Sequence, residues 1–194
     1  MIQFPSKGLV CGCDESGRGA LAGPVVASAV ILPNNFDCPK INDSKKLSFK
    51  IREELSYKIK KESLFWSVGI VDCIEIDKIN ILNASIKAMH LAIETIQKKN
   101  TTIKIGLLLI DGNKFYNYQS IPHRCIIRGD AKYKSIAAAS IIAKTCRDKL
   151  MQKLAIKNTC YNWENNKGYP TKKHKIAIKK HGITKHHRKS FTLL

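Results

Sequence analysis

The sequence feature that most restricts the fold is an apolar segment, residues 105–110 (IGLLLI), which ends directly in Asp111-Gly112-Asn113. The segment contains no charged or polar residue that would mark a solvent-facing side. A strand that is apolar on both faces is typical of the interior of a sheet that helices cover on both sides. The segment therefore predicts an α/β fold in which this strand lies centrally.

Other segments predict the elements around this strand. β-Branched residues between turn-forming boundaries indicate further strands, and apolar residues at intervals of three and four indicate helices. The expected strands cover residues 8–13, 24–32, 65–71 and 124–128, and the expected helices run from Ser48 to about residue 60 (with Ile51, Leu55 and Ile59 on the buried face), from 82 to 96, and from Asp130 to about residue 154. Strands come first and then alternate with helices, which predicts a sheet sandwiched between helices.

The charge of the chain narrows the class of partner. The 34 lysine and arginine residues exceed the 15 aspartate and glutamate residues, giving a formal net charge of +19. A polyanion is the usual compensation for such self-repulsion, with nucleic acid the first candidate and an anionic membrane surface the second; a compositional bias toward lysine is the alternative. From residue 151 onward the basic residues alternate with Tyr161, Trp163 and Tyr169. That mixture is typical of a nucleic-acid groove, although a solvated basic tail fits it too.

The cysteines and the absence of long apolar stretches indicate the compartment. Seven cysteines without a C-x-x-C pair predict buried, reduced thiols and hence a reducing environment. The N-terminus lacks the apolar core of a signal peptide, and no apolar stretch approaches the length of a membrane span. We therefore expect a cytoplasmic protein of 194 residues without a membrane partner, and a monomer, since nothing in the sequence requires more.

Acidic residues are scarce, so their positions are informative. Asp14-Glu15 and Asp111 end apolar strands, and Asp130 begins an expected helix after a glycine. α/β sheets place ligand sites at the carboxyl ends of their strands, where gathered carboxylates need a divalent cation to screen them. Oxygen ligands favour magnesium or manganese over zinc, and two such ions suit phosphodiester hydrolysis. Taken singly, Asp130 is equally well a helix cap and Asp111 part of a turn.

Seven segments resemble, in the same order, the motifs of one enzyme family. They are residues 12–24 (GCDESGRGALAGP), 43–47 (DSKKL), 79–89 (INILNASIKAM), 109–113 (LIDGN), 129–148 (GDAKYKSIAAASIIAKTCRD), 167–171 (KGYPT) and 187–191 (HRKSF). Each motif is weak alone, but their order across nearly the whole chain is specific. By these motifs the chain resembles ribonuclease HII, a type 2 ribonuclease H. Residues 157–166 fit the family only loosely, which leaves the substrate contacts of that stretch open.

The resemblance implies a fold and an active site. The fold would be ribonuclease H-like, an α/β fold with a mixed β-sheet flanked by helices and a small C-terminal helical region. Matched by motif, the four catalytic carboxylates, which would bind Mg²⁺ or Mn²⁺, are Asp14, Glu15, Asp111 and Asp130. The catalytic domain would cover residues 1–194, with about 155–194 as a basic substrate-binding extension.

The resemblance also implies residues that contact the substrate. Gly17, Arg18 and Gly19 would read the 2′-hydroxyl at the cleavage point, because glycines let the main chain approach the sugar and this hydroxyl distinguishes RNA from DNA. Tyr169 would stack on the deoxyribose that follows the ribonucleotide, unless it only packs within its subdomain. Expected phosphate contacts, with a surface turn or solvated helix positions as the alternatives, are Lys45, Lys46, Lys144 and Arg147.

The implied activity is hydrolysis of the RNA strand of RNA–DNA hybrids. It would include incision 5′ of ribonucleotides, single ones among them, in duplex DNA by two-metal-ion catalysis, with a role in ribonucleotide removal, replication and repair. Residues 190–194 (SFTLL) either dock on a sliding clamp or pack as a last turn, and the second is favoured.

Two rival functions remain open on sequence grounds. One is a non-catalytic basic nucleic-acid-binding protein, which explains the charge but not four acids at element ends. The other is the ribonuclease HIII relative, which prefers longer RNA tracts and usually carries an N-terminal substrate-binding domain. Only thirteen residues precede Asp14, which argues against that relative.

Overall fold

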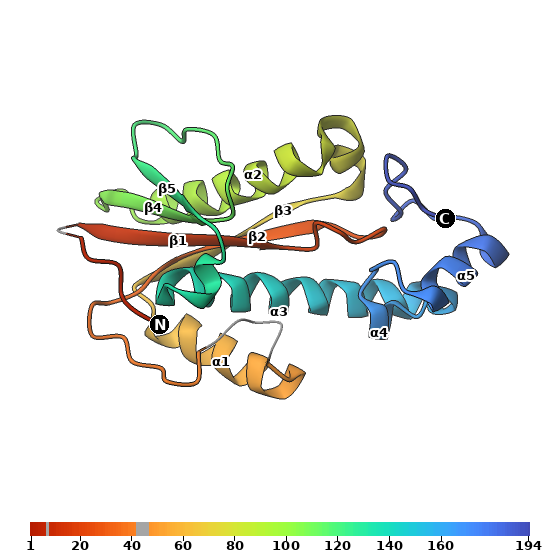
Figure 1. Cartoon of the computed structure of the whole chain (residues 1–194), viewed down its shortest axis with the longest axis horizontal. Coiled ribbons are helices and arrows are strands. Elements are labelled where there is room, and N and C mark those ends of the chain that lie inside the picture. Colours follow the sequence, from red (N-terminus) through yellow and green to blue (C-terminus); the bar gives the residue numbers. More distant parts are fainter. Residues whose placement is uncertain (7, 42–46) are drawn as a thin grey trace.

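A mixed five-stranded sheet forms the centre of the computed structural model, which describes residues 1–6, 8–41 and 47–194. The strands lie in the order β3-β2-β1-β4-β5 (Figure 1). They are β1 (Leu9–Ser16), β2 (Val25–Ile31), β3 (Phe65–Val71), β4 (Ile105–Asp111) and β5 (His123–Ile126). β2 pairs antiparallel with β1 and β3, whereas β4 pairs parallel with β1 and β5. The apolar strand β4 is interior, as predicted, although β1 occupies the middle of the sheet.

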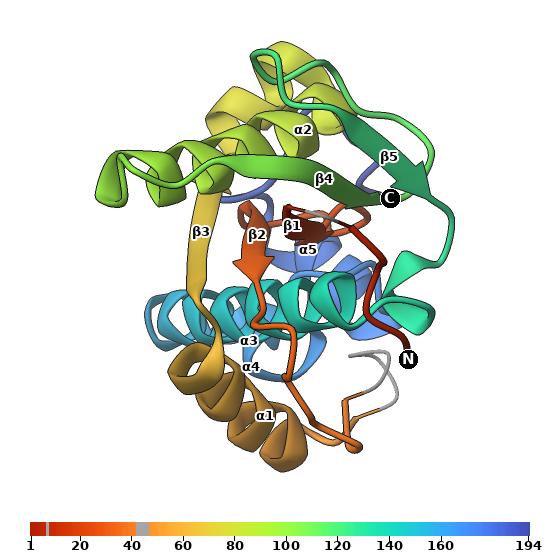
Figure 2. The ribbon, with the colours of Figure 1, turned by 90° about the vertical axis from the view of Figure 1, so that its left-hand side faces the viewer.

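Helices cover both faces of this sheet. The helical elements are α1 (Phe49–Glu62), α2 (Cys73–Lys99), the 3-10 turn η1 (Gly129–Ala131), α3 (Lys134–Lys157), the 3-10 turn η2 (Thr159–Tyr161), α4 (Trp163–Asn166) and α5 (Lys172–His181). Helix α2 lies over one face, and α3 lies over the other with α1 beside it (Figure 2). Strand β2 is buried on both sides because alternate residues serve two cores: Ala29 and Ile31 face the core with α2, and Val30 faces the core with α1 and α3.

The layers approach closely where glycines lie in the strands. A Cβ atom on Gly12 would lie 2.3 Å from the backbone carbon of Ser135 in α3. On the other face, a Cβ atom on Gly69 would lie 2.0 Å from the carbonyl oxygen of Ala88 in α2. A side chain at either position would force helix and sheet apart, so the absence of Cβ atoms sets the spacing of the layers.

Helix α1 begins as predicted and buries two of the three residues expected on its inner face. The hydroxyl of Ser48 accepts a hydrogen bond from the N–H of Ile51, which confirms the predicted N-cap. Ile51 itself is 41% exposed. The buried face is formed by Leu55 and Ile59 together with Arg52, so a charged side chain takes part in a surface expected to be apolar.

Other boundaries also differ from prediction. Helix α2 is interrupted at Asn80, which has a φ of +64° and accepts a hydrogen bond of 3.1 Å from the N–H of Asn83, so the part after this break is the predicted helix. The segment before the break, which Asp72 caps by accepting a hydrogen bond from its first turn, was not predicted. Asp130 lies in the turn η1, and the α-helix expected to begin there starts at Lys134. Strand β5 ends at Ile126 instead of continuing to residue 128, because the chain then turns into η1.

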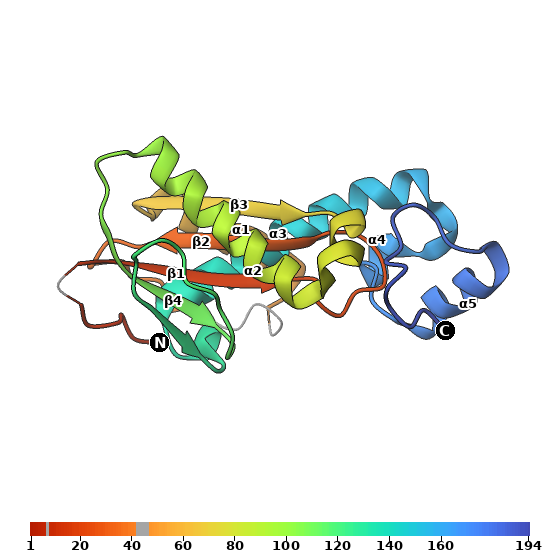
Figure 3. The ribbon, with the colours of Figure 1, turned by 90° about the horizontal axis from the view of Figure 1, so that it is seen from above.

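The C-terminal region lies beyond the end of the sheet, at the far end of α3 (Figure 3). It has a small core of its own, which includes Tyr161, Trp163 and Ile178. Phe191 and Leu193 pack against that core, so residues 190–194 fold back onto the domain, the favoured of the two alternatives.

Two expectations drawn from composition concern cysteines and membranes. All seven cysteines are free thiols, and four of them are buried. In the described part of the chain, no helix combines the length and the apolar character that crossing a bilayer requires.

Candidate active site

Three chain segments bring acidic residues to one edge of the sheet. Asp14 and Glu15 lie near the end of β1, and Asp111 is the last residue of the neighbouring parallel strand β4. Asp130 follows β5 in the turn η1, and the N–H of Gly129 beside it donates a hydrogen bond of 2.7 Å to Oδ1 of Asp111. The predicted gathering of acids therefore follows from the parallel pairing of β1, β4 and β5, whose carboxyl ends meet at this edge.

The carboxylates at this edge repel one another. Asp14 is 5% exposed, and burial, followed by the negative charges of Glu15 and Asp111, raises its pKa well above the usual value. Hydrogen bonds from Ser140 and from the N–H of Glu15 act in the opposite direction without cancelling this effect. A divalent cation bound between these groups would relieve the repulsion, because it favours the ionised form of each.

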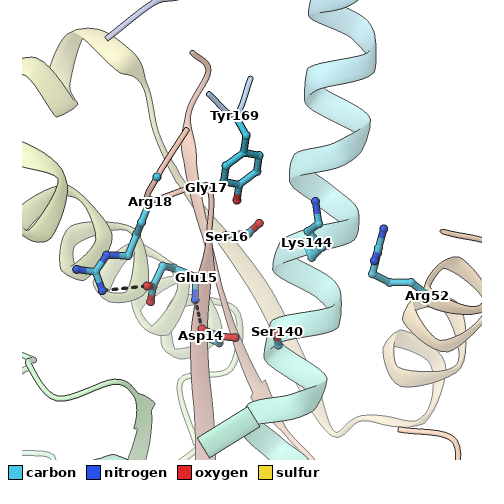
Figure 4. A pocket seen from close by; sticks show the side chains of 10 residues that line it. Asp14, Glu15, Ser16, Gly17, Arg18, Arg52, Ser140, Lys144 and Tyr169 are labelled. Atoms are coloured by element: carbon cyan, nitrogen blue, oxygen red, sulfur yellow. Dashed lines mark hydrogen bonds and ion pairs between the residues drawn. The ribbon is translucent and has the colours of Figure 1, made fainter. Parts of the chain in front are cut away.

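The donor set fits a hard cation, but it is not closed around one. Carboxylate oxygens are the ligands that magnesium and manganese prefer. Among the residues described, no three acidic, histidine or cysteine side chains stand close enough together to form a ready metal site. Oε1 of Glu15 instead forms an ion pair with Nη1 of Arg18 at a distance of 3.4 Å (Figure 4). Binding of a metal would have to draw Glu15 away from this arginine.

A pocket of about 510 Å³ opens beside Asp14 and Glu15. Its lining residues come from β1 and the following loop, from α1, from α3 and from the C-terminal region: Asp14, Glu15, Ser16, Gly17, Arg18, Gly19, Arg52, Ser140, Lys144 and Tyr169 (Figure 4). Asp14 and Glu15 thus line one side of the pocket. Arg52, Lys144 and Tyr169 line the opposite side, which we call the basic wall. An extended polyanion that must reach the acids would pass between them.

Two glycines of the loop after β1, Gly17 and Gly19, differ in whether the fold could accommodate a side chain. Gly17 has a φ of +99°, and a Cβ atom there would lie 2.0 Å from Nε of Arg147. The fold therefore requires glycine at this position. Gly19 is exposed, and a Cβ atom there would meet no atom of the protein within 4 Å. The fold leaves room for a side chain at Gly19, so a need for glycine there would have to come from a ligand.

Tyr169 is half-buried at the pocket wall, where its ring lies against two cations. The guanidinium carbon of Arg147 is 5.2 Å from the ring centroid, and Nζ of Lys144 is 5.9 Å from it. Cations at these distances interact favourably with the ring face. The ring also lines the pocket, as Figure 4 shows, so it is available to a substrate.

Arg147 does not occupy the position expected of a phosphate contact. Its side chain is 0% exposed, and its guanidinium donates to the carbonyl oxygens of Pro24, Lys167 and Ala22 at 2.9, 2.9 and 3.1 Å. The prediction is corrected accordingly: this arginine supports the backbone under the pocket. Helix periodicity does not reveal such a role, because the three acceptors come from distant segments.

Lys144 and a residue that sequence reasoning missed form the basic wall. Nζ of Lys144 lies 2.6 Å from one oxygen of Asp148, and Nη2 of Arg52 lies 3.2 Å from the other. Asp148 is almost fully buried, so it holds both cations at the pocket. One signal for Arg52 was available: three positions before Leu55, it falls on the buried face of α1. The predicted contacts Lys45 and Lys46 lie outside the described residues.

Comparisons with known proteins identify the family and the fold. The family model described as ribonuclease HII matches residues 11–194. A ribonuclease HII of Parabacteroides distasonis is 56% identical over 183 residues, covering 94% of this chain and 89% of that protein. The crystal structure of ribonuclease H2 from Pyrococcus horikoshii OT3 has a TM-score of 0.75 at 24% identity, covering 95% of this chain and 94% of that chain.

A further solved structure, that of a complex of PCNA with ribonuclease HII from Archaeoglobus fulgidus, also has a TM-score of 0.75. It is 23% identical and covers 96% of both chains. These structures show the ribonuclease H-like fold, and the family model and the 56% identical relative show the enzyme class. The chain belongs to the ribonuclease HII family, whose members are divalent-metal-dependent ribonucleases H that act on RNA–DNA hybrids.

Proposed function

We propose that this chain incises duplex DNA on the 5′ side of embedded ribonucleotides, single ones included, leaving a 3′-hydroxyl and a 5′-phosphate. The observation that carries the proposal is the pocket itself, in which crowded carboxylates adjoin an exposed backbone loop containing Gly19. Such an arrangement brings a phosphodiester to the acids and a sugar edge to the loop. Removal of ribonucleotides during DNA replication and repair is the role that we infer from this activity.

The residues proposed to hold Mg²⁺ or Mn²⁺ are Asp14, Glu15, Asp111 and Asp130. When bound, two such ions would activate the attacking water and stabilise the leaving oxygen. The protein supplies the negative charge and its arrangement: Asp14 is fixed by Ser140, and the N–H of Gly129 fixes Asp111. Release of Glu15 from Arg18 would complete the ligand set.

The loop after β1 is proposed to select the sugar. Main-chain groups of Gly17, Arg18 and Gly19 would contact the 2′-hydroxyl, which only a ribonucleotide carries. Tyr169 would stack on the next deoxyribose, held from behind by Arg147. Lys144 at the basic wall would contact a phosphate, and Lys45 and Lys46 remain proposed phosphate contacts on sequence grounds.

The proposal also includes the extent of the catalytic domain, the oligomeric state and the contact with a sliding clamp. One catalytic domain would span residues 1–194, with about 155–194 as its basic extension along the duplex, and the chain would act as a monomer. The Archaeoglobus fulgidus relative was solved in complex with PCNA. Phe191 and Leu193 are engaged with the domain, so a clamp contact through the C-terminus would have to use the surface that they leave exposed.

The test is a cleavage assay on a labelled duplex with one internal ribonucleotide, in magnesium or manganese. An all-DNA duplex and two variants, Asp111→Asn and Asp37→Asn, run beside it. Asn at position 111 keeps an oxygen for the N–H of Gly129 but removes the charge, so the rate should fall at least about 100-fold. The exposed Asp37 serves as a matched control and should leave the rate unchanged. Failure of the folded protein to cut in either metal would refute single-ribonucleotide incision.

A further inference from the structure

Two fully buried arginines hold the loop after β1 from below. Arg147 of α3 and Arg188 of the C-terminal segment are both 0% exposed. In the part of the chain that the structure describes, neither guanidinium forms an ion pair with a carboxylate; their donors go to backbone carbonyls. Arg188 donates to the carbonyl of Gly23 through Nε at 3.0 Å and Nη2 at 2.9 Å, and to the carbonyl of Arg18 through Nη1 at 2.8 Å.

Burying these two like charges together is unfavourable. Burial, followed by the nearby charge of Arg147, lowers the pKa of Arg188 to about 9. Taking a charged group out of water costs several kcal/mol, and carbonyl acceptors offset that cost without supplying an opposite charge. Stability alone therefore does not account for a pair of guanidinium groups at this place, whereas a need to hold several carbonyls in fixed directions does, because a guanidinium offers a rigid fork of donors.

The contact to the Arg18 carbonyl sets the direction of one peptide group. Because a trans peptide is planar, its N–H points opposite to its carbonyl. The carbonyl of Arg18 points inward to Arg188, so the N–H of Gly19 in the same peptide points outward. Gly19 is exposed and lines the pocket beside Glu15. A donor thus faces the space where the sugar is expected.

The segment that carries Arg188 is itself anchored on two sides. The N–H of Arg188 donates to the carbonyl of Leu21, and the N–H of Gly23 donates to the carbonyl of His186, both at 2.8 Å. The two backbone N–H groups that follow Arg188 donate to Asp77 at the start of α2, each at 2.9 Å. Residues 187–191 (HRKSF) are therefore held by hydrogen bonds to α2 on one side and to the loop on the other.

We propose that Arg188 is a positioning residue for substrate recognition: it locks the Arg18–Gly19 peptide so that the N–H of Gly19 donates a hydrogen bond to the 2′-oxygen of a ribonucleotide. This inference rests on the proposed function, in which that loop reads the sugar. Loss of the guanidinium fork would free the peptide to rotate and would remove the preference for ribose, while the carboxylates and the phosphate contacts stay in place.

The test measures binding in an Asp111→Asn background, where cleavage is suppressed, to a duplex with one ribonucleotide and to the matching all-DNA duplex. The parent should bind the first more tightly. Arg188→Lys, which keeps the charge but loses the fork, should weaken that binding about tenfold, in line with the loss of one hydrogen bond. Binding of the all-DNA duplex should be unchanged, because phosphate contacts dominate it. A mere loss of stability would not separate the two duplexes.

Controls keep the outcomes distinct. Ile93→Val lowers stability within the core under α2, away from the loop, and should keep the ribose preference. Nuclear magnetic resonance on the parent should show the Gly19 amide shifting with the ribonucleotide duplex but not with DNA. An unchanged preference in folded Arg188→Lys overturns the inference, as does loss of the folded spectrum in both Arg188→Lys and Arg188→Gln. Equal binding of both duplexes by the parent would overturn this inference and the proposed function together. The cleavage assay tests the proposed function independently of Arg188.

Discussion

The same substitution at two nearby glycines should have opposite consequences. Gly17→Ala introduces a methyl group at a φ of +99° and 2.0 Å from Nε of the buried Arg147. Gly19→Ala introduces one into open space, at a backbone conformation outside the left-handed region. The first is therefore expected to damage the fold, and the second to leave it intact while changing what the pocket admits.

The size of the first effect follows from two contributions. A left-handed conformation costs a residue with a Cβ atom about 1–2 kcal/mol. Arg147 is fully buried and its guanidinium is held by three carbonyls, so displacing it should break at least one of these bonds. One hydrogen bond from a charged group contributes about 1.5–3 kcal/mol. The free energy of unfolding should fall by about 2.5–5 kcal/mol. For a chain of this length, Tm should fall by at least about 5 °C.

Urea unfolding followed by circular dichroism measures the stability, and cleavage of the single-ribonucleotide duplex measures the function. Gly19→Ala should stay within about 0.5 kcal/mol of the wild type. Its kcat/KM should nevertheless fall, because the new methyl group occupies the place through which the sugar reaches the main chain. Wild-type stability in Gly17→Ala would refute the reasoning, and so would equal destabilisation of the two variants.

Two further predictions concern buried polar groups. Burial, followed by a histidine neighbour, lowers the pKa of His187 from 6.5 to about 4; because the unfolded chain takes up this proton first, stability should be full above pH 6.5 and fall by up to about 3 kcal/mol as the pH drops to 4. Urea titrations at stepped pH measure this, and His187→Gln should reduce the dependence of the free energy of unfolding on pH. An equally strong pH dependence in that variant would show that other groups cause it. Asp148→Asn should cost about 3 kcal/mol because it leaves Arg52 and Lys144 without their buried partner. Glu94→Gln, at an exposed ion pair, should cost less than about 1 kcal/mol in the same unfolding assay.

Much of the fold could be predicted because its causes are local in the chain. The apolar run at 105–110 becomes the interior strand β4, and the periodic residues 82–96 lie within α2. Ser48 caps α1 through an atom three residues away. Such features depend on side-chain alternation and on nearby hydrogen bonds, both of which are visible in a single sequence. The prediction was incomplete where an additional capped segment precedes the expected helix, as after Asp72, and a boundary was wrong where the turn η1 delays the start of α3.

The candidate site was predictable only in part. That Asp14 and Asp111 would meet at one sheet edge followed from their places after two apolar strands, once a parallel sheet was assumed. The raised pKa of Asp14 was not predictable, because it depends on burial and on charges that other strands bring near. Nor did any local pattern show that Lys144 would share Asp148 with Arg52, since 96 positions separate Arg52 from Asp148.

What the sequence determined by itself, then, is the order of strands and helices, the basic character and the motifs that place the chain in its family. The tertiary structure decided what the arginines do. Arg147 was expected at a phosphate, yet the folded chain buries it under Gly17, and Arg188 reaches a carbonyl 165 positions away. The physical reason is that a buried donor bonds to whatever acceptors the topology brings within about 3 Å, and such long-range pairing leaves no periodic trace in the sequence.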